Sequence, residues 1–435
     1  MATTTMHSLP VELLAEIFTH CLPKNATPTA TSNSPLLLMR VCRLWRDITV
    51  ATPVLWTTFS IDLTSAKGMI PSESLELWLS RSQNMPLTIN VDDAGCEEPR
   101  ADPQYWMVYE ELCRHAQRWQ SVTFNIPFAA IWCLPTQQPL KLLKGLKFGS
   151  EEEDQPVPGQ ALESFATAPQ LRAVDITLDA SGAVYIQGIH LPWHQLTTFR
   201  GTLFATYECA FVLREATNLV DCRFSDVSTG MVSDSPPKPH FQLCELQMDA
   251  RNLITCLDLL PFFSFPNLKR LALGSLVREG RSQISWSVFN SLLSRSSCSL
   301  VRLDISVNNI KWTDSLVECF SLLPSLEHME IFWFNEESSI TPLLQTSNAL
   351  LPRLHTLVLY SENSPSSPWI NDIVSLLFVR TSDKWVTAHG ASLQHFHYIW
   401  MRLGDPYPDE TVQSRIKALR DRGLHVEFRP NEPFV

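Results

Sequence analysis

The sequence predicts an α/β protein in which a small helical module, residues 8–56, precedes a curved α/β solenoid with a parallel sheet, residues 57–435. Two short amphipathic stretches near the start, separated by a polar loop, predict the helical module. Short strand-like segments then recur at nearly regular spacing, with apolar residues at their first, fourth and sixth positions. Prolines that stand just before several of these segments predict that each strand follows the end of a helix.

Composition and charge narrow the class of protein. The 435 residues are 45% hydrophobic, which is enough for a large buried core, and the length favours about two or three domains. The net charge is -11 and no Lys/Arg-rich run occurs, so we expect no nucleic-acid partner.

Cysteine usage and hydropathy bear on the compartment. The 11 cysteines include no CxxC pair, which is typical of reduced thiols in the cytoplasm or the nucleus. The N-terminus carries no pattern of a signal peptide. Asp258 and Pro261 interrupt the most apolar stretch, 253–265, which is shorter than the ~20 residues of a membrane span. We therefore expect no membrane partner.

The first amphipathic stretch, residues 9–22, predicts a helix. Pro10 suits the first helical position because its missing N–H is no loss there, and Glu12 lies where the helix dipole favours negative charge. Three- and four-residue spacing gathers the apolar residues on one broad face. They are Leu13, Leu14, Ile17, Phe18, Cys21 and Leu22.

A polar, proline-containing loop, 24–35, leads to a second helical stretch, 36–51, whose polar stripe is Arg40, Arg43 and Asp47. The two stretches carry more apolar surface than a unit of about 50 residues can bury alone. Part of this surface must therefore pack against the next domain or bind a partner. An ordinary helical cap for the repeat region is the alternative.

The Leu-Pro start, the Ile-Phe pair and the later Val-Cys-x-x-Trp signature resemble an F-box, the helical module of substrate-receptor subunits in SCF-type cullin–RING ubiquitin ligases. The resemblance covers residues 8–56. It departs from the family at 24–35, where the family has a short acidic and hydrophobic stretch. The resemblance implies a Skp-type adaptor as partner, and through it a cullin scaffold. The implied adaptor-binding residues are Leu9, Pro10, Leu13, Leu14, Ile17, Phe18, Val41, Cys42 and Trp45.

The strand-like segments begin at residues 119, 143, 171, 196, 219, 243, 268, 300, 326, 354 and 393. Most of the intervals lie between 23 and 28 residues, inside the range of leucine-rich repeats, whose unit begins LxxLxL. We expect residues 87–91 to be an earlier member and residues 425–428 to be a last edge strand. The turns lack a regular Asn, which is similar to the degenerate leucine-rich repeats of many F-box proteins.

Pro169, Pro266, Pro324 and Pro352 each stand two residues before the first Leu of a segment, and each predicts the end of a helix. The stretches 161–168, 287–295 and 315–323 read as such helices. Stacked helix–strand units would form a curved parallel sheet with helices outside. A non-repetitive α/β domain is the alternative.

Alternation along each strand places the third, fifth and seventh positions on the open face of the sheet. We select five of these residues as candidate target-binding residues because they combine charge with aromatic rings: Arg270, Arg302, His328, Phe332 and Tyr360. The same face carries Asp175, Arg223, Glu245, Gln247, Asp304, Glu330, His395 and His397. The alternative is a solvated sheet face without a specific role.

The last element, 409–423, predicts an amphipathic helix that caps the solenoid. Asp409 is a plausible N-cap, and Gly423 would end the helix. Its apolar face consists of Val412, Ile416 and Leu419. Such a helix covers the final sheet edge.

The sequence contains none of the common motifs of nucleotide binding or of nucleophilic catalysis. It contains no phosphate loop, no GxGxxG and no GxSxG. Pro192 separates His190 from His194, and His395 and His397 read as a surface pair, so we expect no metal, no cofactor and no enzyme. The leading hypothesis is a substrate-recognition subunit of an SCF-type ubiquitin ligase. The alternative is a leucine-rich-repeat scaffold without a ligase role, and an enzyme comes third.

Overall fold

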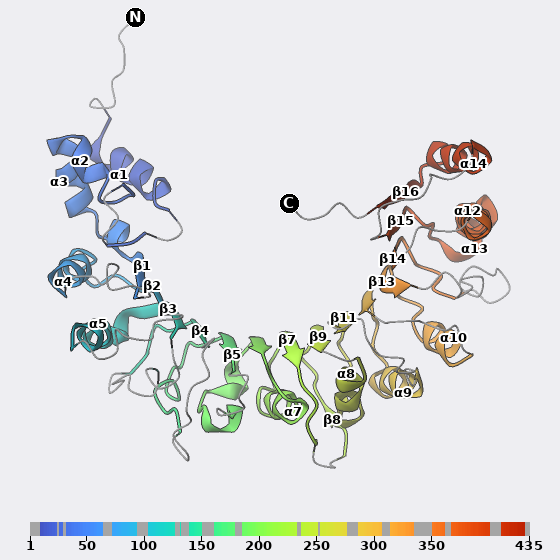
Figure 1. Ribbon diagram of the computed structural model, residues 1–435, viewed down its shortest axis with the longest axis horizontal. Helices are drawn as coiled ribbons and strands as arrows, with labels where there is room; N and C mark the ends of the chain where they lie inside the picture. Colours follow the sequence, from blue (N-terminus) through green and yellow to red (C-terminus); the bar gives the residue numbers. More distant parts are fainter. Residues whose placement is uncertain are drawn as a thin grey trace, which may run out of the picture. The chain divides into compact units, whose positions relative to one another are not determined.

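The computed structural model describes residues 9–23, 26–28, 32–63, 72–93, 103–126, 131, 139–149, 161–178, 185–232, 236–250, 253–275, 286–306, 314–334, 350–361, 367–400 and 410–430. The chain forms two compact units, Met1–Gly201 and Thr202–Val435. Each unit contains parallel strands with helices beside them (Figure 1).

Unit 1 begins with a helical head made of α1 (Val11–His20), α2 (Leu38–Val41), α3 (Arg43–Ala51) and the 3-10 helix η2 (Pro53–Trp56). The single helix expected at 36–51 is wrong. Cys42 is extended, with φ -159° and ψ 173°, and separates α2 from α3. Pro10 stands at the N-cap instead of the first helical position, and its carbonyl accepts hydrogen bonds from the backbone of Leu13 and Leu14.

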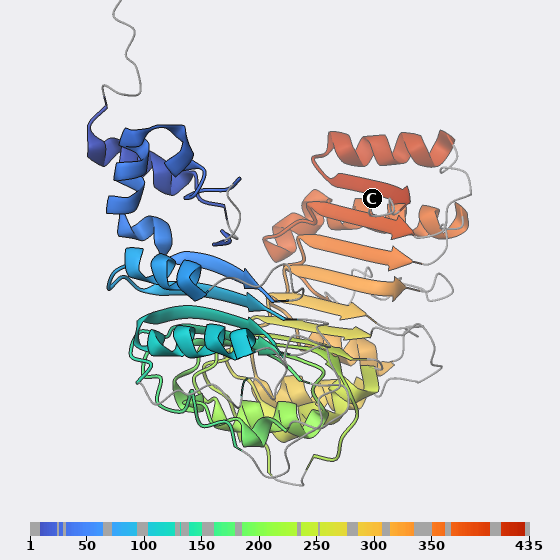
Figure 2. The same ribbon diagram turned by 60° about the vertical axis from the view of Figure 1, so that its left-hand side comes forward.

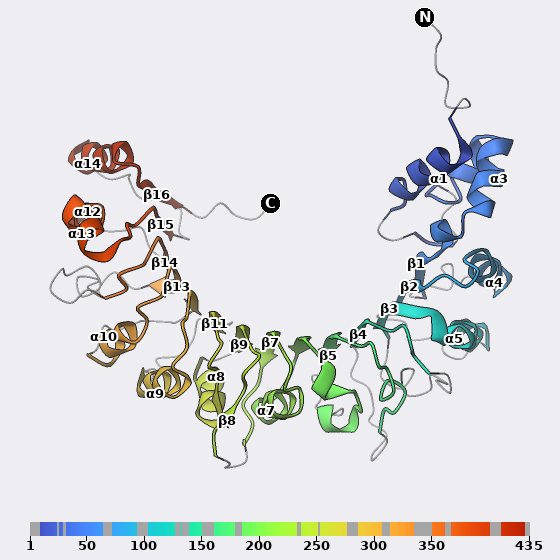
Figure 3. The ribbon, with the colours of Figure 1, turned by 180° about the vertical axis from the view of Figure 1, so that it is seen from behind.

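The strands of unit 1 lie in the order of the sequence, and the pairings from β1 to β5 are parallel. They are β1 (Thr58–Asp62), β2 (Leu87–Asp92), β3 (Trp119–Asn125), β4 (Gly145–Gly149), β5 (Ala173–Thr177) and β6 (Thr198–Thr202). Helices α4 (Ser72–Arg81) and α5 (Pro103–Arg114) lie on one side of β1 to β3 (Figure 3). The 3-10 helices of the unit are η4 (Ala116–Arg118), η5 (Ile186–Gly188) and η6 (Trp193–Gln195).

The helix expected at 161–168 is also wrong, because this stretch consists of turns and one isolated bridge. The backbone N–H of Leu162 donates to the carbonyl of Gly188 at 2.8 Å, and the Leu162 carbonyl accepts from His190 at 3.0 Å. These hydrogen bonds hold the backbone extended at Leu162, so it cannot join a helical turn.

Unit 2 has the same kind of arrangement, with parallel strands in sequence order and helices on one side of them (Figure 2). Its main strands are β7 (Asp221–Val227), β9 (Glu245–Ala250), β11 (Arg270–Ser275), β12 (Arg302–Ser306), β13 (His328–Phe334), β14 (Thr356–Ser361), β15 (His395–Trp400) and β16 (His425–Pro430). A small parallel pair joins β8 (Lys238–Pro239) to β10 (Phe263–Ser264). The helices are α7 (Thr206–Glu215), α8 (Leu253–Leu259), η7 (Leu260–Phe262), α9 (Trp286–Ser296), α10 (Asp314–Ser321), α12 (Ser367–Arg380), α13 (Asp383–His389) and α14 (Glu410–Asp421).

The apolar positions of the predicted segments form the core. Each segment contributes a strand, and alternating burial along the strands places the apolar side chains on the helix side. Leu271 and Leu273 of β11, for example, are buried. In every segment from residue 143 onward the first residue is a leucine that lies just before its strand and is buried as well. These leucines are Leu143, Leu171, Leu196, Leu219, Leu243, Leu268, Leu300, Leu326, Leu354 and Leu393.

Side chains also donate hydrogen bonds to backbone carbonyl groups that lie shortly before the preceding strand. In unit 1, Gln195 donates to the carbonyl of Ala168 at 2.6 Å. In unit 2, Arg295 donates to the carbonyl of Leu260 at 2.9 Å and Arg380 to that of Leu350 at 2.7 Å. Burial lowers the pKa of Arg380 to about 10. Each of these bonds joins residues at least 27 apart in the sequence, so the side chains tie neighbouring segments of the sheet to one another.

The last helix, α14, agrees with the sequence pattern at its described residues. Val412, Ile416 and Leu419 are buried, and Gly423 has the positive φ of 90° that suits a residue just after a helix. Arg415 donates to Asn371 of α12 at 2.9 Å. The predicted N-cap, Asp409, lies outside the described residues. In the part of the chain that the structure describes, no helix combines the length and apolar character of a membrane span.

Candidate functional site

Helix α1 carries two apolar stripes, one of which is buried and the other exposed. Leu14 and Phe18, four residues apart, are fully buried inside the head. Leu13 and Ile17, also four residues apart, are exposed at 52% and 38% of their surface. A helix of a monomer that buries one apolar stripe has no need of a second, so the Leu13–Ile17 stripe is available for binding.

The buried stripe is held by aromatic contacts. The Phe18 ring lies 4.8 Å from the ring of Trp45 on α3, so Trp45 is half-buried. At the other end of the head, the indole N–H of Trp56 donates to the carbonyl of Thr49 at 2.9 Å. The guanidinium of Arg81 on α4 lies 4.5 Å from the centre of the Trp56 ring. The head is therefore fixed to the first helix that follows it in unit 1.

Exposed apolar side chains are concentrated in the head. Among the described residues, 17 large hydrophobic side chains are exposed, and eight of them lie between Val11 and Val54. Scattered exposed hydrophobic residues are ordinary, but so many within one small module indicate an interaction surface. Besides Leu13 and Ile17 the set contains Val11, Leu37, Val41, Leu44, Val50 and Val54, which come from α1, from α2 and its N-cap, from α3 and from η2.

The helical head with this surface has a counterpart among known protein families. Residues 6–62 match the F-box-like family model. The match begins before α1 and continues to the last residue of β1, so the F-box-like domain includes the first strand of unit 1 as well as the helices. No curated protein matches the chain.

The structure separates the residues that the resemblance selected in the F-box-like domain into two groups. Leu14 and Phe18 lie in its core, and their contribution is to its fold. The exposed ones are Pro10, Leu13, Ile17 and Val41, whereas Leu9, Cys42 and Trp45 are half-buried. The sequence pattern did not select Val11, Leu37 or Leu44, although Leu37 stands four residues before Val41, which is the spacing of one helix face.

The candidate target-binding residues all lie on unit 2's sheet face opposite the buried leucines. The strand register aligns Arg270 with Arg302 and Arg302 with His328. Four residues further along the same two strands, Phe332 aligns with Ser306. The sequence pattern therefore placed these side chains on the correct face, and the register adds which of them are neighbours.

Arg302 is the centre of a cluster of charges on this face. Its guanidinium donates to Asp304 at 2.8 Å and to Glu330 at 2.9 Å, and His328 lies 2.9 Å from the same oxygen of Glu330. Burial lowers the pKa of Arg302, but the two carboxylates outweigh burial and the net shift is upward. The hydrogen bond with His328 lowers the pKa of Glu330. The positive charge of Arg302 is thus balanced by two carboxylates within the sheet face, so Arg302 offers little free positive charge to a target.

Arg270 and the aromatic pair are the more available parts of the face. Arg270 is exposed and pairs with Glu245 at 3.3 Å, a weak contact for an ion pair. The rings of Phe332 and Tyr360 stack with their centres 4.4 Å apart and their planes within 4°. Both rings are half-buried, so they present a flat apolar surface flanked by charge. Such a surface suits a protein segment with an aromatic or aliphatic anchor.

Two groups of side chains on the described strands of unit 2 have the donor types and the proximity of metal ligands. One consists of Asp304, His328 and Glu330, and the other of His395, His397 and His425. Nδ1 of His190, a residue for which the sequence predicts no metal site, lies 2.7 Å from a carboxylate oxygen of Glu163.

Proposed function

We propose that this protein is a substrate-recognition subunit of an SCF-type cullin–RING ubiquitin ligase. In this proposal the F-box-like domain binds a Skp-type adaptor, and the adaptor links the chain to a cullin scaffold. The open sheet face of unit 2 binds the protein that is to be ubiquitinated. The protein is not itself an enzyme, because its effect is to hold a target lysine near a ligase that other subunits supply.

The exposed apolar surface of the F-box-like domain carries the proposal. Leu13 and Ile17 remain exposed although the core of the domain is complete without them. A helical cap that only closed the end of the sheet would bury its apolar face against β1 and α4. Here Trp56 makes that contact, and the Leu13–Ile17 stripe is left over. The family match at residues 6–62 supports a Skp-type adaptor as the occupant of this surface.

The architecture supports a leucine-rich-repeat-like solenoid as the target-binding part. A buried leucine starts each strand segment of unit 2, and the backbone N–H that follows it donates to the preceding segment, as Lys269 does to Cys244 and Val301 to Lys269, both at 2.8 Å. Regular stacking of this kind builds an extended sheet face, which is the usual binding surface of solenoids. The nine described cysteines form no disulfide, which is compatible with the proposed cytoplasmic or nuclear location.

Affinity purification of the tagged full chain from cells, followed by mass spectrometry, tests the proposal. The wild type is expected to bring down a Skp-type adaptor, a cullin and a set of target proteins. The Tyr360→Ala variant breaks the aromatic stack, so we expect it to keep the adaptor and the cullin but to lose targets by about tenfold or more. Leu322→Ala is the matched control, because Leu322 is exposed just after α10, on the helix side of unit 2.

The two parts of the proposal fail separately in this experiment. Recovery of neither adaptor nor cullin with the wild type would contradict the ligase role and favour a scaffold. Recovery of the same targets with Tyr360→Ala and wild type, at equal amounts, would exclude the aromatic pair as the recognition surface. Circular dichroism of each variant confirms that a loss of binding is not a loss of fold.

A further inference from the structure

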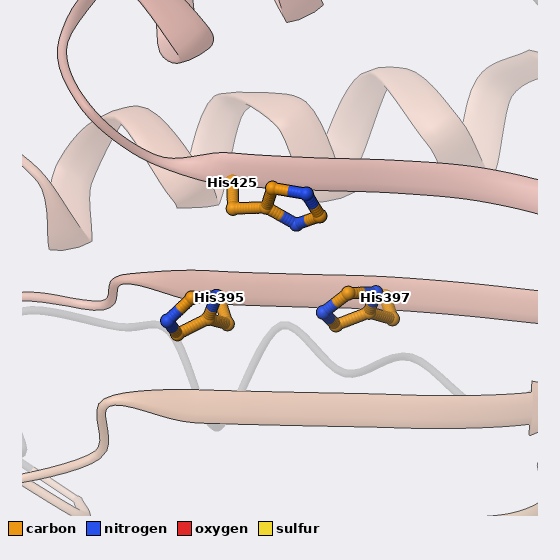
Figure 4. Close-up of side chains that lie close together, drawn as sticks. All are labelled: His395, His397 and His425. Carbon is orange, nitrogen blue, oxygen red and sulfur yellow. The ribbon is translucent and has the colours of Figure 1, made fainter. Parts of the chain in front are cut away.

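Three histidines meet on the open face of the last two strands. His395 and His397 are two residues apart on β15 and therefore point to the same face, and the register pairs His395 with His425 of β16. Figure 4 shows the three imidazoles gathered on this face. One ring nitrogen from each lies within 4.8 Å of the others.

This spacing is close to what a metal ion requires. A zinc ion binds imidazole nitrogen at about 2.0–2.1 Å, so the nitrogens of a tetrahedral site lie about 3.4 Å apart. The ring centres of His397 and His425 are 5.1 Å apart and those of His395 and His425 are 5.7 Å apart. His395 and His425 are exposed, so small rotations of their side chains can close the remaining gap without a change in the backbone.

A carboxylate forms a hydrogen bond with the His397 ring and orients it as a metal ligand. Glu427, aligned with His397 in the strand register, lies 2.7 Å from Nδ1 of that ring. Because a carboxylate accepts hydrogen bonds, Nδ1 carries the proton and Nε2 is the nitrogen that can coordinate. Arg429 holds the other oxygen of Glu427 at 3.2 Å. A histidine oriented by a carboxylate in this way is the usual surrounding of a zinc ligand.

The second group, Asp304, His328 and Glu330, is less suited to a metal ion because its carboxylates already have a partner. Arg302 already donates to both of its carboxylates, at 2.8 and 2.9 Å. A cation would have to displace the guanidinium and then lie close to it. The positive charge of Arg302 therefore disfavours a metal ion there.

We propose that His395, His397 and His425 form a binding site for a divalent transition metal ion, with Zn²⁺ as the expected ion. Imidazole nitrogen favours zinc and its neighbours over Ca²⁺ and Mg²⁺, which prefer oxygen ligands. The exposure of two of the histidines leaves solvent to complete the coordination. Bound metal ties β16, the final strand of the sheet, to β15 and stabilises this edge of unit 2.

The test uses the metal-free full chain, titrated with Zn²⁺ by calorimetry and with Co²⁺ by absorption spectroscopy. The wild type is expected to take up one ion at this site, and its Co²⁺ spectrum is expected to show nitrogen ligation without the charge-transfer band of a thiolate. This readout separates the site from any thiolate site, which among the described cysteines would draw on the exposed or half-buried Cys21, Cys42, Cys244 and Cys298. His425→Ala is expected to lose this binding.

Two further variants sharpen the result. His20→Ala removes an exposed histidine of α1 and is expected to bind like the wild type. Glu427→Gln keeps the three ligands but weakens the orientation of His397, and we expect about 10- to 100-fold weaker binding. Equal metal uptake by the wild type and His425→Ala, or a wild type that takes up no ion, would overturn the proposal. Identical circular dichroism of the metal-free variants shows that the fold is unchanged.

Discussion

Replacing Leu13 and Ile17 together by alanine is expected to weaken binding of a purified Skp-type adaptor about 30- to 1000-fold. The two side chains form one exposed stripe on α1, so they would be buried together at the centre of the proposed contact. Loss of such anchors is worth about 2–4 kcal/mol of binding free energy. The domain should stay folded, because Leu14 and Phe18 on the neighbouring stripe keep their contacts. The measurement is the dissociation constant of the full chain, alongside circular dichroism.

Leu77→Ala is the matched control for this variant. Leu77 is half-exposed like Leu13, but it lies on α4, outside the match to the F-box-like family. It should bind the adaptor as the wild type does. Phe18→Ala, in contrast, should unfold the head, since its ring is fully buried against Trp45. A folded double variant with unchanged affinity would rule out this stripe, and a double variant that unfolds would favour the helical cap.

Leu271→Ala is expected to lower the free energy of unfolding by about 2–5 kcal/mol. Leu271 is buried on β11, between Leu246 of β9 and Leu303 of β12 in the strand register. Its removal leaves a cavity in the middle of the unit 2 core, and the strands on both sides limit how far the structure can relax. Denaturant unfolding measures the effect as a lower midpoint with an unchanged slope.

Val220→Ala serves as the control for this stability measurement, because Val220 is exposed just before β7. Its replacement should change the free energy of unfolding by no more than about 0.5 kcal/mol. A cost below about 1 kcal/mol for Leu271→Ala would mean that the leucine rows do not form the main core. Adaptor binding should survive in Leu271→Ala, since the head and β11 belong to different compact units.

The parallel strands could be predicted because the pattern that defines them is local. Apolar residues at the first, fourth and sixth positions fix which face is buried, and the burial of Leu268, Leu271 and Leu273 follows directly. The helices were harder to place. The stretch 161–168 has helical composition, yet the pairing of Leu162 with Ile189 takes its backbone into an extended bridge. A contact between residues so far apart in sequence leaves no local signal.

The candidate site was predictable in part. Local spacing identified the apolar face of α1. It could not show that Leu14 and Phe18 are buried in the core of the head, whereas Leu13 and Ile17 stay exposed. The histidine cluster was missed for the same reason. The alternation of residues 425–428 was visible as a strand, but only the register shows that His425 lies beside His395.

Calorimetric titration of the full chain with a purified Skp-type adaptor, repeated at several temperatures, tests the central claim most directly. If the exposed apolar surface of the F-box-like domain is the docking site, binding is saturable at one adaptor per chain. The heat capacity change is then negative, because apolar surface leaves water on binding. An absence of saturable binding would contradict the proposed function, and binding with a heat capacity change near zero would contradict the apolar surface as its basis.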